Sequence, residues 1–493
     1  MTALPGMVRL PYVTDQRAQR NRLALCILVS TLLIWGLVDV RRRGVIDPAN
    51  LNQHKTDLTV YTEAGAAFFD GREPYQVTNV RGWGYLYPPL FAMLMAPLSA
   101  LPPTEQVLTW FLLSLLTVWG CVHEIRRLCV LLTARQPVEF RTSDGAAPRA
   151  WPAWIWYAAS LAVLLPTLNC LQRGQVGVLL LYLLLLGWRL CLEGRTALSH
   201  STAGVVLAAS IVLKVTPLLP VACLCGQMLL AASFHSQRRA QARLAWATTL
   251  GVLGGVALFA LLVPASLIGW DTNTHHLQTW WTLVGTKAGD PGYDNFAGDS
   301  HTVRNQSLSN AAQRFGNWAA FQVGAGPDDR AAPADGAEPK MPMDAPLAKQ
   351  TLLATRLLLL ALLAWPMWTT VRRQDRLGQA ATVGLACVAT LVASPISRGH
   401  YFMLLLPAVL LVPAWLNEAG RTRAAQQMAW SAVALVMAHY LLMRFTGRIG
   451  LLGIGITVWY VAAVVLVARG TVPQAAAARL PVRGTLARQH VAA

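Results

Sequence analysis

One carboxylate in this chain stands where general-base chemistry is a natural expectation. Asp57 opens an informative stretch, from Asp57 to Pro102, that lies between two strongly apolar segments. An aspartate at a membrane boundary can take a proton from an acceptor hydroxyl group. The other interpretation, which spacing alone favours, is that Asp57 caps the amphipathic helix that follows it, because Asp is a good N-cap residue.

Lys214 is the second candidate, because it interrupts a long apolar run. A charge inside a membrane helix costs about 2.5–3.5 kcal/mol on insertion scales, so it is usually functional. Its long side chain could instead snorkel toward the membrane surface. Pro217 follows three residues later, however, and a helix that is broken at this depth forms a polar niche that suits a phosphate. We therefore expect Lys214 to bind a phosphate group.

The other candidates lie in short connectors. Arg173 and Arg398 stand in predicted tight turns, and together with Lys214 they would form a cationic site for a phosphate or diphosphate. His400 would hydrogen-bond a phosphoryl oxygen or protonate a leaving group, unless it is a simple interfacial residue. The segment Asn305-Gln306-Ser307 matches the short N-glycosylation acceptor pattern, which leaves a glycan site and a binding loop both open.

The elements that position these residues are membrane helices. The chain of 493 residues is 55% hydrophobic and 13% charged, whereas soluble proteins carry about 25% charged residues. Many apolar runs reach or approach the roughly 20 residues that cross a bilayer. The sequence therefore predicts an all-α polytopic membrane protein. The eight cysteines, mostly in or beside apolar runs, are interpreted as small hydrophobic residues, not as disulfides or zinc ligands.

Lys and Arg dominate the charge of the chain, whose formal net charge is +18. In membrane proteins these residues collect in cytoplasmic loops and set the topology. No soluble basic domain is visible, so we expect no nucleic-acid partner. We predict a basic cytoplasmic N-terminus over 1–22, a transmembrane domain over 23–468 and a basic cytoplasmic tail over 469–493.

The transmembrane domain is predicted to cross the membrane about twelve times, provided that the apolar run 203–233 divides into two short helices near Lys214. A helical first loop, 41–105, and a long loop, 269–350, then lie outside. Residues 324–346 of the long loop are rich in Gly, Pro, Ala and Asp, which is typical of a flexible segment. All the candidate residues fall toward the external face. This suggests one site, although polar residues also gather at membrane interfaces by chance.

The ordered motifs resemble glycosyltransferase family 87, a group of polytopic enzymes of the GT-C superfamily that includes mycobacterial polyprenyl-phosphomannose-dependent mannosyltransferases. The matching pieces are Asp57-Leu-Thr-Val-Tyr61, Gly71-Arg-Glu-Pro-Tyr75, Tyr87-Pro-Pro-Leu90 with Ala96-Pro-Leu98, Gly174-Gln175, Lys214 with Pro217, Asn305-Gln-Ser-Leu308, and Ser394-Pro-Ile-Ser397 with His400. They occur in the family's order. The chain departs from the family pattern at Arg398, where a tryptophan is expected.

The resemblance implies a GT-C fold and the transfer of a hexose, expected to be mannose, from a polyprenyl-phosphate sugar. The acceptor would be a lipid or glycan on the outer face of a bacterial plasma membrane, and the anomeric carbon would be inverted. Asp57 matches the presumed base and His400 a contact to the donor phosphate. We expect a donor site that contains Lys214, His400, Arg398, Arg173 and Gln175, and substrate contacts from Tyr61, Tyr87, Asn305, Gln306 and Ser307.

The expected chemistry needs no cofactor, because the lipid-linked sugar is a co-substrate. The first loop contains no Asp-x-Asp pair, so we expect no metal site. Tyr87-Pro88-Pro89 and the apolar run after it would form the wall of a groove for the lipid chain.

Two other functions remain open from the sequence. A transporter or lipid flippase with the same helix count would need charges near the membrane midplane and repeated halves. Lys214 is the only strong candidate for such a charge, and no convincing duplication is visible. An inactive scaffold built on the transferase fold also agrees with the sequence.

Overall fold

The computed structural model describes residue 27 and the ranges 30–43, 57–78, 84–133, 151–234, 238–286, 305–312, 315, 346–447 and 449–470. These ranges are mostly helical and contain no strand, only two isolated bridges, which confirms the predicted all-α class. The predicted N-terminal segment 1–22, the tail from residue 471 onward and residues 324–345 lie outside the described residues.

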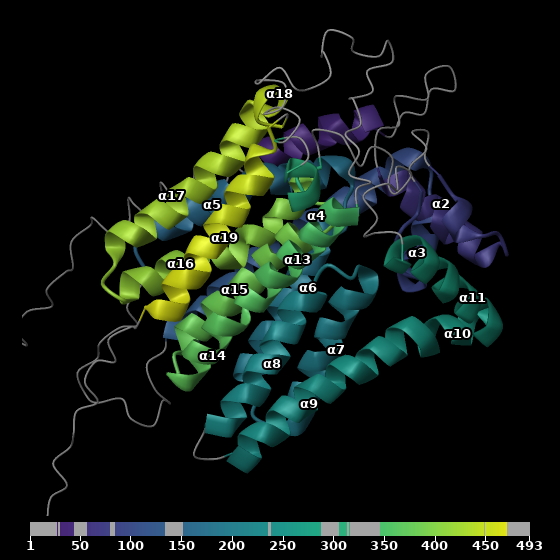
Figure 1. The fold of residues 1–493 in the computed structure, drawn as a ribbon. Coiled ribbons are helices and arrows are strands. Elements are labelled where there is room, and N and C mark those ends of the chain that lie inside the picture. Colours follow the sequence, from purple (N-terminus) through teal and green to yellow (C-terminus); the bar gives the residue numbers. More distant parts are fainter. Residues whose placement is uncertain are drawn as a thin grey trace, which may run out of the picture.

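The described helices form a main bundle and a smaller layer beside it (Figure 1). The main bundle contains α4 (Pro103–Thr133), α5 (Ala153–Arg173), α6 (Gly177–Glu193), α7 (Ala197–Leu213), α8 (Leu218–Phe234), α9 (Arg238–Ala257), α13 (Pro346–Leu362), α14 (Ala364–Arg372), α15 (Arg376–Ala393), η6 (Gly399–Leu405), α16 (Leu406–Glu418), α17 (Thr422–Leu441), α18 (Met443–Thr446) and α19 (Leu451–Arg469). The layer contains α2 (Leu58–Phe69), η1 (Pro74–Gln76), α3 (Pro89–Ser99), α10 (Val263–Ile268) and α11 (Trp270–Trp280). The π-helical segment η3 (Leu258–Leu262) joins α9 to α10, and η4 (Trp281–Thr286) follows α11.

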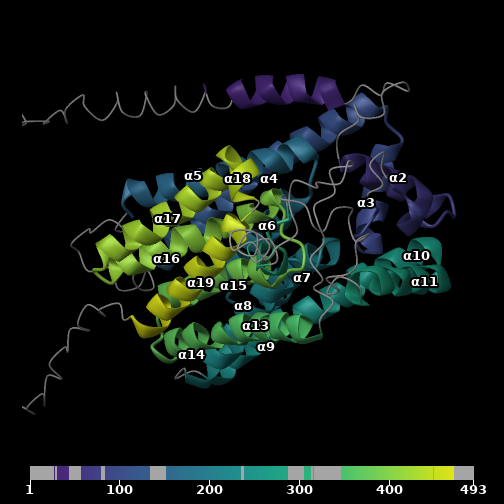
Figure 2. The same ribbon diagram turned by 45° about the horizontal axis from the view of Figure 1, so that its top comes forward.

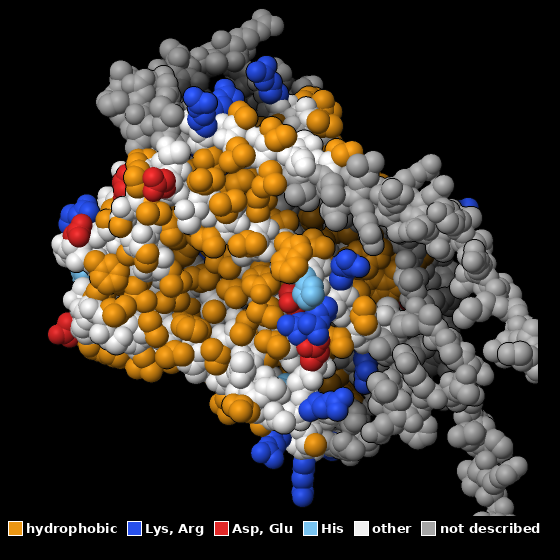
Figure 3. All heavy atoms as spheres, turned by 180° about the vertical axis from the view of Figure 1, so that it is seen from behind, with side chains coloured by type: hydrophobic (Ala, Val, Ile, Leu, Met, Phe, Trp, Pro, Cys, Tyr) orange, Lys and Arg blue, Asp and Glu red, His pale blue; other side chains and the backbone are white. Residues whose placement is uncertain are grey.

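Seven helices among the described residues are long and apolar enough to cross a membrane. One of them is the continuous helix Arg238–Ile268. Only 17% of its most apolar 18-residue stretch is buried inside the protein. Its exposed leucines include Leu250 and Leu253. Figure 3 shows that one face of the molecule is broadly hydrophobic, with few charged side chains. Such a surface suits contact with lipid, and the chain is a multi-pass membrane protein.

The apolar run 203–233 is divided, as the sequence predicts. Helix α7 ends at Leu213 and α8 begins at Leu218. Lys214 lies between them in extended backbone, with φ −165° and ψ 129°. Pro217 cannot donate a backbone hydrogen bond, so it prevents a continuous helix here. Because of this break, Lys214 lies outside regular helix, between the end of α7 and the start of α8.

The layer of α2, α3, α10 and α11 lies at one edge of the bundle, as Figure 2 also shows. Helices α2 and α3 approach closely at Gly65, which has no side chain. A Cβ atom at this position would lie only 2.7 Å from the backbone nitrogen of Ala96. The buried side chains of Leu58, Tyr61 and Phe91 form a separate hydrophobic core there. The described part of the first loop is therefore a packed helical unit, and it can hold Asp57 in a fixed position.

A charged cluster joins α4 to α6 inside the bundle. Arg189 donates hydrogen bonds to the carboxylates of Glu124 and Glu193, and Arg127 lies 3.2 Å from Glu193. Glu124 and Arg189 are 4% and 8% exposed. The sequence analysis did not predict this cluster. Mutual pairing explains how these charges can lie within apolar helices, because a buried charge without a partner is strongly destabilising.

Candidate active site

Asp57 occupies the N-cap position of α2, but its side chain makes no capping hydrogen bond. The carboxylate instead accepts hydrogen bonds from Arg173 Nε, at 3.2 Å, and from the Gln175 side-chain amide. Asp57 is 7% exposed. The interpretation that its side chain serves only as a helix cap is therefore wrong. Asp57 is a buried carboxylate whose orientation is fixed by a cation and an amide.

The turn between α5 and α6 brings these two partners to Asp57. Helix α5 ends at Arg173, and Gly174 follows in the left-handed conformation with φ +67°. Side chains other than glycine are strained there. A Cβ atom on Gly174 would also lie 3.0 Å from the Leu58 Cβ atom. The glycine therefore permits a tight turn that places Arg173 and Gln175 against the start of α2.

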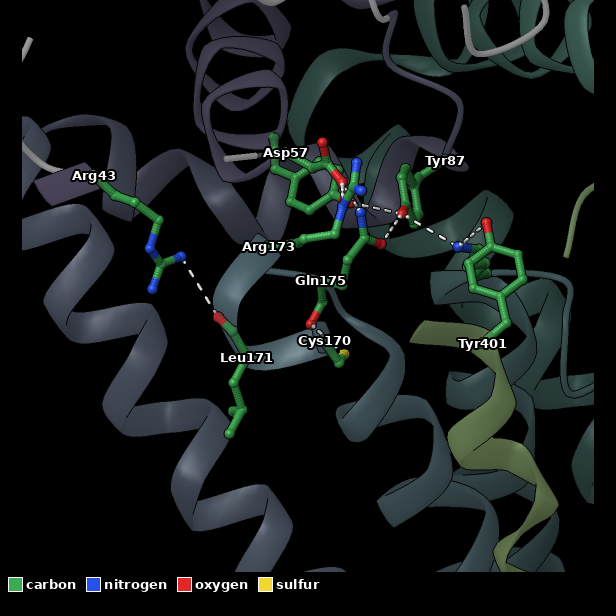
Figure 4. Close-up of polar contacts among 10 residues, drawn as sticks. Arg43, Asp57, Tyr87, Cys170, Leu171, Arg173, Gln175 and Tyr401 are labelled. Carbon is green, nitrogen blue, oxygen red and sulfur yellow. Dashed lines mark hydrogen bonds and ion pairs between the residues drawn. The ribbon is translucent and has the colours of Figure 1, made fainter. Parts of the chain in front are cut away.

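Two tyrosines and a lysine extend the contacts beyond Gln175. The Tyr87 hydroxyl donates to Gln175 Oε1 at 3.3 Å and lies 2.7 Å from the Tyr61 hydroxyl. Lys214 Nζ donates to the hydroxyls of Tyr87, at 3.3 Å, and Tyr401, at 2.9 Å. Figure 4 shows this continuous hydrogen-bonded path, which runs from Asp57 to Tyr401. We call it the Asp57–Tyr401 network: Asp57, Arg173, Gln175, Tyr61, Tyr87, Lys214 and Tyr401.

Burial favours the protonated form of the two loop tyrosines further. It raises the pKa of Tyr61 well above its ordinary value. It also raises the pKa of Tyr87, although the Lys214 charge opposes the shift. Both hydroxyl groups therefore stay protonated at neutral pH and remain able to donate hydrogen bonds. The tyrosines hold Lys214 in a second way as well, because its ammonium lies 4.2 Å from the centroid of the Tyr401 ring and 4.9 Å from that of Tyr87.

His400 lies beside this network. It is 2% exposed, and its ring packs edge-on against Tyr401 with 4.6 Å between the centroids. Neither ring nitrogen has a hydrogen-bond partner among the residues that the structure describes. Arg173, Lys214 and Arg398 are close enough for their charges to act on the ring. Buried polar groups are nearly always paired in native proteins, so an unpaired imidazole among cations suits an anionic ligand.

Residues 305–307 hold the segment that leads into η6. Asn305 Oδ1 accepts hydrogen bonds from the backbone of Ser397, at 3.0 Å, and of Ser307, at 3.1 Å. The Gln306 backbone donates to the Ser397 carbonyl at 2.7 Å. All three side chains are buried. The geometry gives them a positioning role near Arg398, and direct substrate contact by them stays a prediction.

The glycan interpretation of Asn305 fits the structure poorly. Its Nδ2 atom donates to the Pro395 carbonyl at 3.3 Å, and the residue is 2% exposed. N-glycosylation modifies this nitrogen and places a bulky sugar at a protein surface. Asn305 is therefore a structural residue of the folded protein.

The structure brings most of the predicted site residues together at one end of the bundle. Asp57, Arg173, Gln175, Tyr61, Tyr87 and Lys214 belong to the network itself, and His400 and Arg398 adjoin it. Tyr401 is the member that the sequence analysis missed. The sequence feature that could have identified Tyr401 is its position directly after His400, next to the motif Ser394-Pro-Ile-Ser397. The turns α5–α6, α7–α8 and α15–η6 thus meet at this end.

Comparisons with known proteins identify the family of the chain. The family model described as Glycosyltransferase family 87 matches residues 85–395, which is more than half of the chain. Asp57 precedes the matched range and His400 follows it. No solved structure gives a match.

Two curated mycobacterial proteins are similar to this chain. Both are described as polyprenol-phosphate-mannose-dependent alpha-(1-2)-phosphatidylinositol mannoside mannosyltransferases. The protein from Mycolicibacterium smegmatis is 26% identical over 400 residues, which cover 78% of this chain and 74% of the relative. The protein from Mycobacterium tuberculosis is 26% identical over 377 residues, which cover 73% and 70%. From the family match and the helical membrane fold, the chain belongs to glycosyltransferase family 87 and is a membrane glycosyltransferase.

Proposed function

We propose that this chain transfers a mannosyl group from a polyprenyl-phosphate mannose to a hydroxyl group of a glycolipid or glycan. The names of the two relatives support this donor, and they make a phosphatidylinositol mannoside the first acceptor to test. The single observation that carries the proposal is the path of hydrogen bonds from Asp57 to Lys214. It joins a carboxylate that can accept a proton to a cation that can hold a phosphate.

Asp57 is the general base of the proposed reaction. The acceptor oxygen forms a bond to the anomeric carbon while the bond from that carbon to the phosphate oxygen breaks. The acceptor proton passes to the Asp57 carboxylate, and the polyprenyl phosphate leaves with the bonding electrons. A single displacement of this kind inverts the anomeric carbon. Arg173 and Gln175 hold the carboxylate in one orientation, which a general base requires.

Lys214, Arg398 and His400 bind the donor phosphate in this proposal. The Lys214 ammonium has three N–H donors. Two of them point to tyrosine hydroxyls, so a third is available to a phosphoryl oxygen. The unpaired ring nitrogens of His400 can contact the same phosphate. Charge-assisted hydrogen bonds of this kind stabilise the leaving phosphate without a metal or other cofactor.

The apolar walls beside the network suit the lipid chain of the donor. Tyr87 and Pro88 lead directly into α3, whose residues are mostly hydrophobic. The ring of Tyr87 packs against Phe91, with 5.0 Å between centroids. An apolar surface of this kind can cover prenyl units next to a phosphate-binding cation.

The proposed site faces the outer side of the cell membrane. Basic residues lie at the opposite ends of the helices that carry the site: Arg372, Arg373, Arg376, Arg421 and Arg423. Basic segments of this kind remain in the cytoplasm. We retain the predicted arrangement of about twelve crossings, with external loops over 41–105 and 269–350 and cytoplasmic termini.

The test is Asp57→Asn in membranes supplied with polyprenyl-phosphate mannose and phosphatidylinositol mannoside. The variant keeps the size of the side chain but removes the base, so kcat should fall by about 10²–10⁴-fold. Asp70→Asn is the matched control, because Asp70 belongs to the same loop, is exposed and contacts Arg72. Unchanged transfer by Asp57→Asn at a normal protein level would refute the proposed base. Wild-type protein that moves the donor across vesicles without transfer would favour the flippase.

A further inference from the structure

A second set of chemically competent side chains joins the first loop to α11. Glu73 precedes η1, and His275 and His276 lie in α11. His275 Nε2 is 3.1 Å from Glu73 Oε2, and His276 Nδ1 is 3.5 Å from Glu73 Oε1. The three ligand atoms lie within 4.8 Å of one another. Two imidazoles and a carboxylate therefore converge on one point from elements about 200 residues apart.

Neighbouring groups fix the orientation of these side chains. The Tyr75 backbone N–H donates to Glu73 Oε1 at 3.4 Å. The His276 ring packs against Phe68 and Tyr75, with 5.5 Å and 6.3 Å between the centroids. Supporting contacts of this kind orient the ligands in known metal sites and strengthen the binding of the metal.

The Nδ1 atom of His276 points to a missing partner. His276 is 5% exposed, and this nitrogen has no hydrogen-bond partner in the described part of the chain, because its approach to Glu73 does not have hydrogen-bond geometry. The more exposed His275 already supplies the hydrogen bond to the Glu73 carboxylate. A simple ion pair with Glu73 therefore does not require the His276 imidazole. A buried His276 Nδ1 without a hydrogen-bond partner is also unfavourable, which favours a further ligand at this point.

We propose that Glu73, His275 and His276 bind a Zn²⁺ ion. Two histidines and one glutamate are an established donor set for zinc sites that keep a fourth position for water. Imidazole nitrogen favours zinc over Mg²⁺ and Ca²⁺, which prefer oxygen ligands. The sequence analysis predicted no metal because it considered carboxylate pairs within the first loop, whereas this donor set forms only when two loops meet.

The metal would fix the wall that carries Tyr87. The Tyr75 hydroxyl donates to the Tyr87 carbonyl at 3.1 Å, and Trp280 Nε1 in α11 donates to the Leu86 carbonyl at 3.3 Å. Both elements that supply zinc ligands thus also hold the segment before α3. In this proposal the ion holds η1 against α11 and keeps a water in its fourth position, and this role does not depend on the identity of the sugar donor or acceptor.

The test measures zinc directly. The full chain is purified in detergent with a tag that contains no histidine, stripped with EDTA and dialysed against ZnCl₂, and its zinc content is measured by mass spectrometry. We expect one ion per chain, and a visible absorption typical of Co²⁺ bound to nitrogen and oxygen ligands when CoCl₂ replaces zinc. Zinc should also raise the Tm of the wild-type protein.

His275→Ala is the decisive variant, because its side chain is 65% exposed and its removal should leave folding intact. We expect the affinity for zinc to fall by at least about tenfold, since even the loss of a group that merely supports a ligand costs about 10–100-fold. Zinc should no longer raise the Tm. His276→Ala should have the same effect, whereas the exposed His123→Ala, on α4, should bind zinc as the wild type does. Failure of the wild type to retain zinc, or equal retention by His275→Ala, would overturn the proposal.

Discussion

Asp57 and Arg173 contact each other twice, through the backbone and through their side chains. The Asp57 N–H donates to the Arg173 carbonyl at 3.0 Å, and Arg173 Nε donates to the Asp57 carboxylate at 3.2 Å. The first contact fixes the start of α2 on the end of α5, and the second fixes the carboxylate itself. The proposed base is thus positioned by the main bundle as well as by its own loop.

Arg173→Ala should lower kcat, because the Asp57 carboxylate loses one of its two side-chain partners. A hydrogen bond to a charged group contributes about 1.5–3 kcal/mol, so the expected decrease is about ten- to a hundredfold if the contact acts in the transition state. Arg72→Ala, an exposed arginine of the first loop, should leave kcat unchanged. Initial rates at saturating donor and acceptor measure the effect. Equal kcat values for Arg173→Ala and the wild type would show that Asp57 does not need this partner.

Lys214→Ala should raise the KM for the polyprenyl-phosphate donor more than the KM for the acceptor, because it removes a proposed phosphate ligand. Tyr401→Phe should have a smaller effect in the same direction. It deletes one partner of the Lys214 ammonium but leaves Tyr87 in place. A hydrogen bond to a charged group contributes about 1.5–3 kcal/mol, so the effect should not exceed about ten- to a hundredfold. Tyr157→Phe is the control, since Tyr157 on α5 is 66% exposed. A defect confined to the acceptor would count against the phosphate role of Lys214.

His400→Phe should separate activity from stability. The His400 ring nitrogens have no partners among the described residues, so a ring without them should leave the Tm unchanged or raise it. Transfer should nevertheless fall sharply, because the donor phosphate loses its proposed imidazole contact.

The comparison variant for this experiment is His200→Phe. His200 is also buried, but its ring nitrogens contact Thr248 Oγ1 at 2.9 Å and the Gly194 carbonyl at 3.2 Å. Loss of these contacts should destabilise the protein by about 1–3 kcal/mol. Thermal unfolding in detergent and the transfer rate are measured on both variants. A large loss of stability in His400→Phe would indicate a structural role for His400.

Glu124→Ala should be strongly destabilising. It leaves Arg189 buried with only Glu193 as a partner, so the loss should approach the roughly 3–5 kcal/mol that a fully unpaired buried charge costs. The replacement of both residues, Glu124→Leu with Arg189→Met, should recover much of this loss, because it removes the buried arginine and leaves Glu193 paired with Arg127. Glu105→Ala, an exposed glutamate in the first turn of α4, is the control for the Tm measurement. A double variant less stable than Glu124→Ala would contradict this account.

Asn305→Ala should lower both the Tm and the transfer rate, because the Ser397 and Ser307 N–H groups lose their acceptor. A buried donor without a partner costs about 1–3 kcal/mol. The same residue should carry no sugar when the chain is expressed in a host that glycosylates proteins, because its amide is buried and already bonded. Mass spectrometry of the purified protein tests this point, and a glycan on Asn305 would show that residues 305–307 are accessible.

The sequence by itself determined the all-α membrane class and the family. These features depend on hydropathy, proline and short motifs, which act within one segment of the chain. The division of the apolar run at Lys214 is an example, since Pro217 and the charge both lie at the break. The local motifs also singled out Asp57, Lys214 and His400 as candidates, because each stands in a run of sequence where its type is unusual.

Only the tertiary structure decided which side chains meet. The sequence left two roles open for Asp57, and spacing alone favoured a cap of α2. The packing of α2 on α5 directed its carboxylate to Arg173 and Gln175. No sequence pattern predicts the contacts of Tyr401, of the Glu124–Arg189 pair or of the Glu73–His275–His276 cluster. Contacts between such distant residues depend on how helices pack in three dimensions, and the spacing of residues within a segment carries no information about that packing.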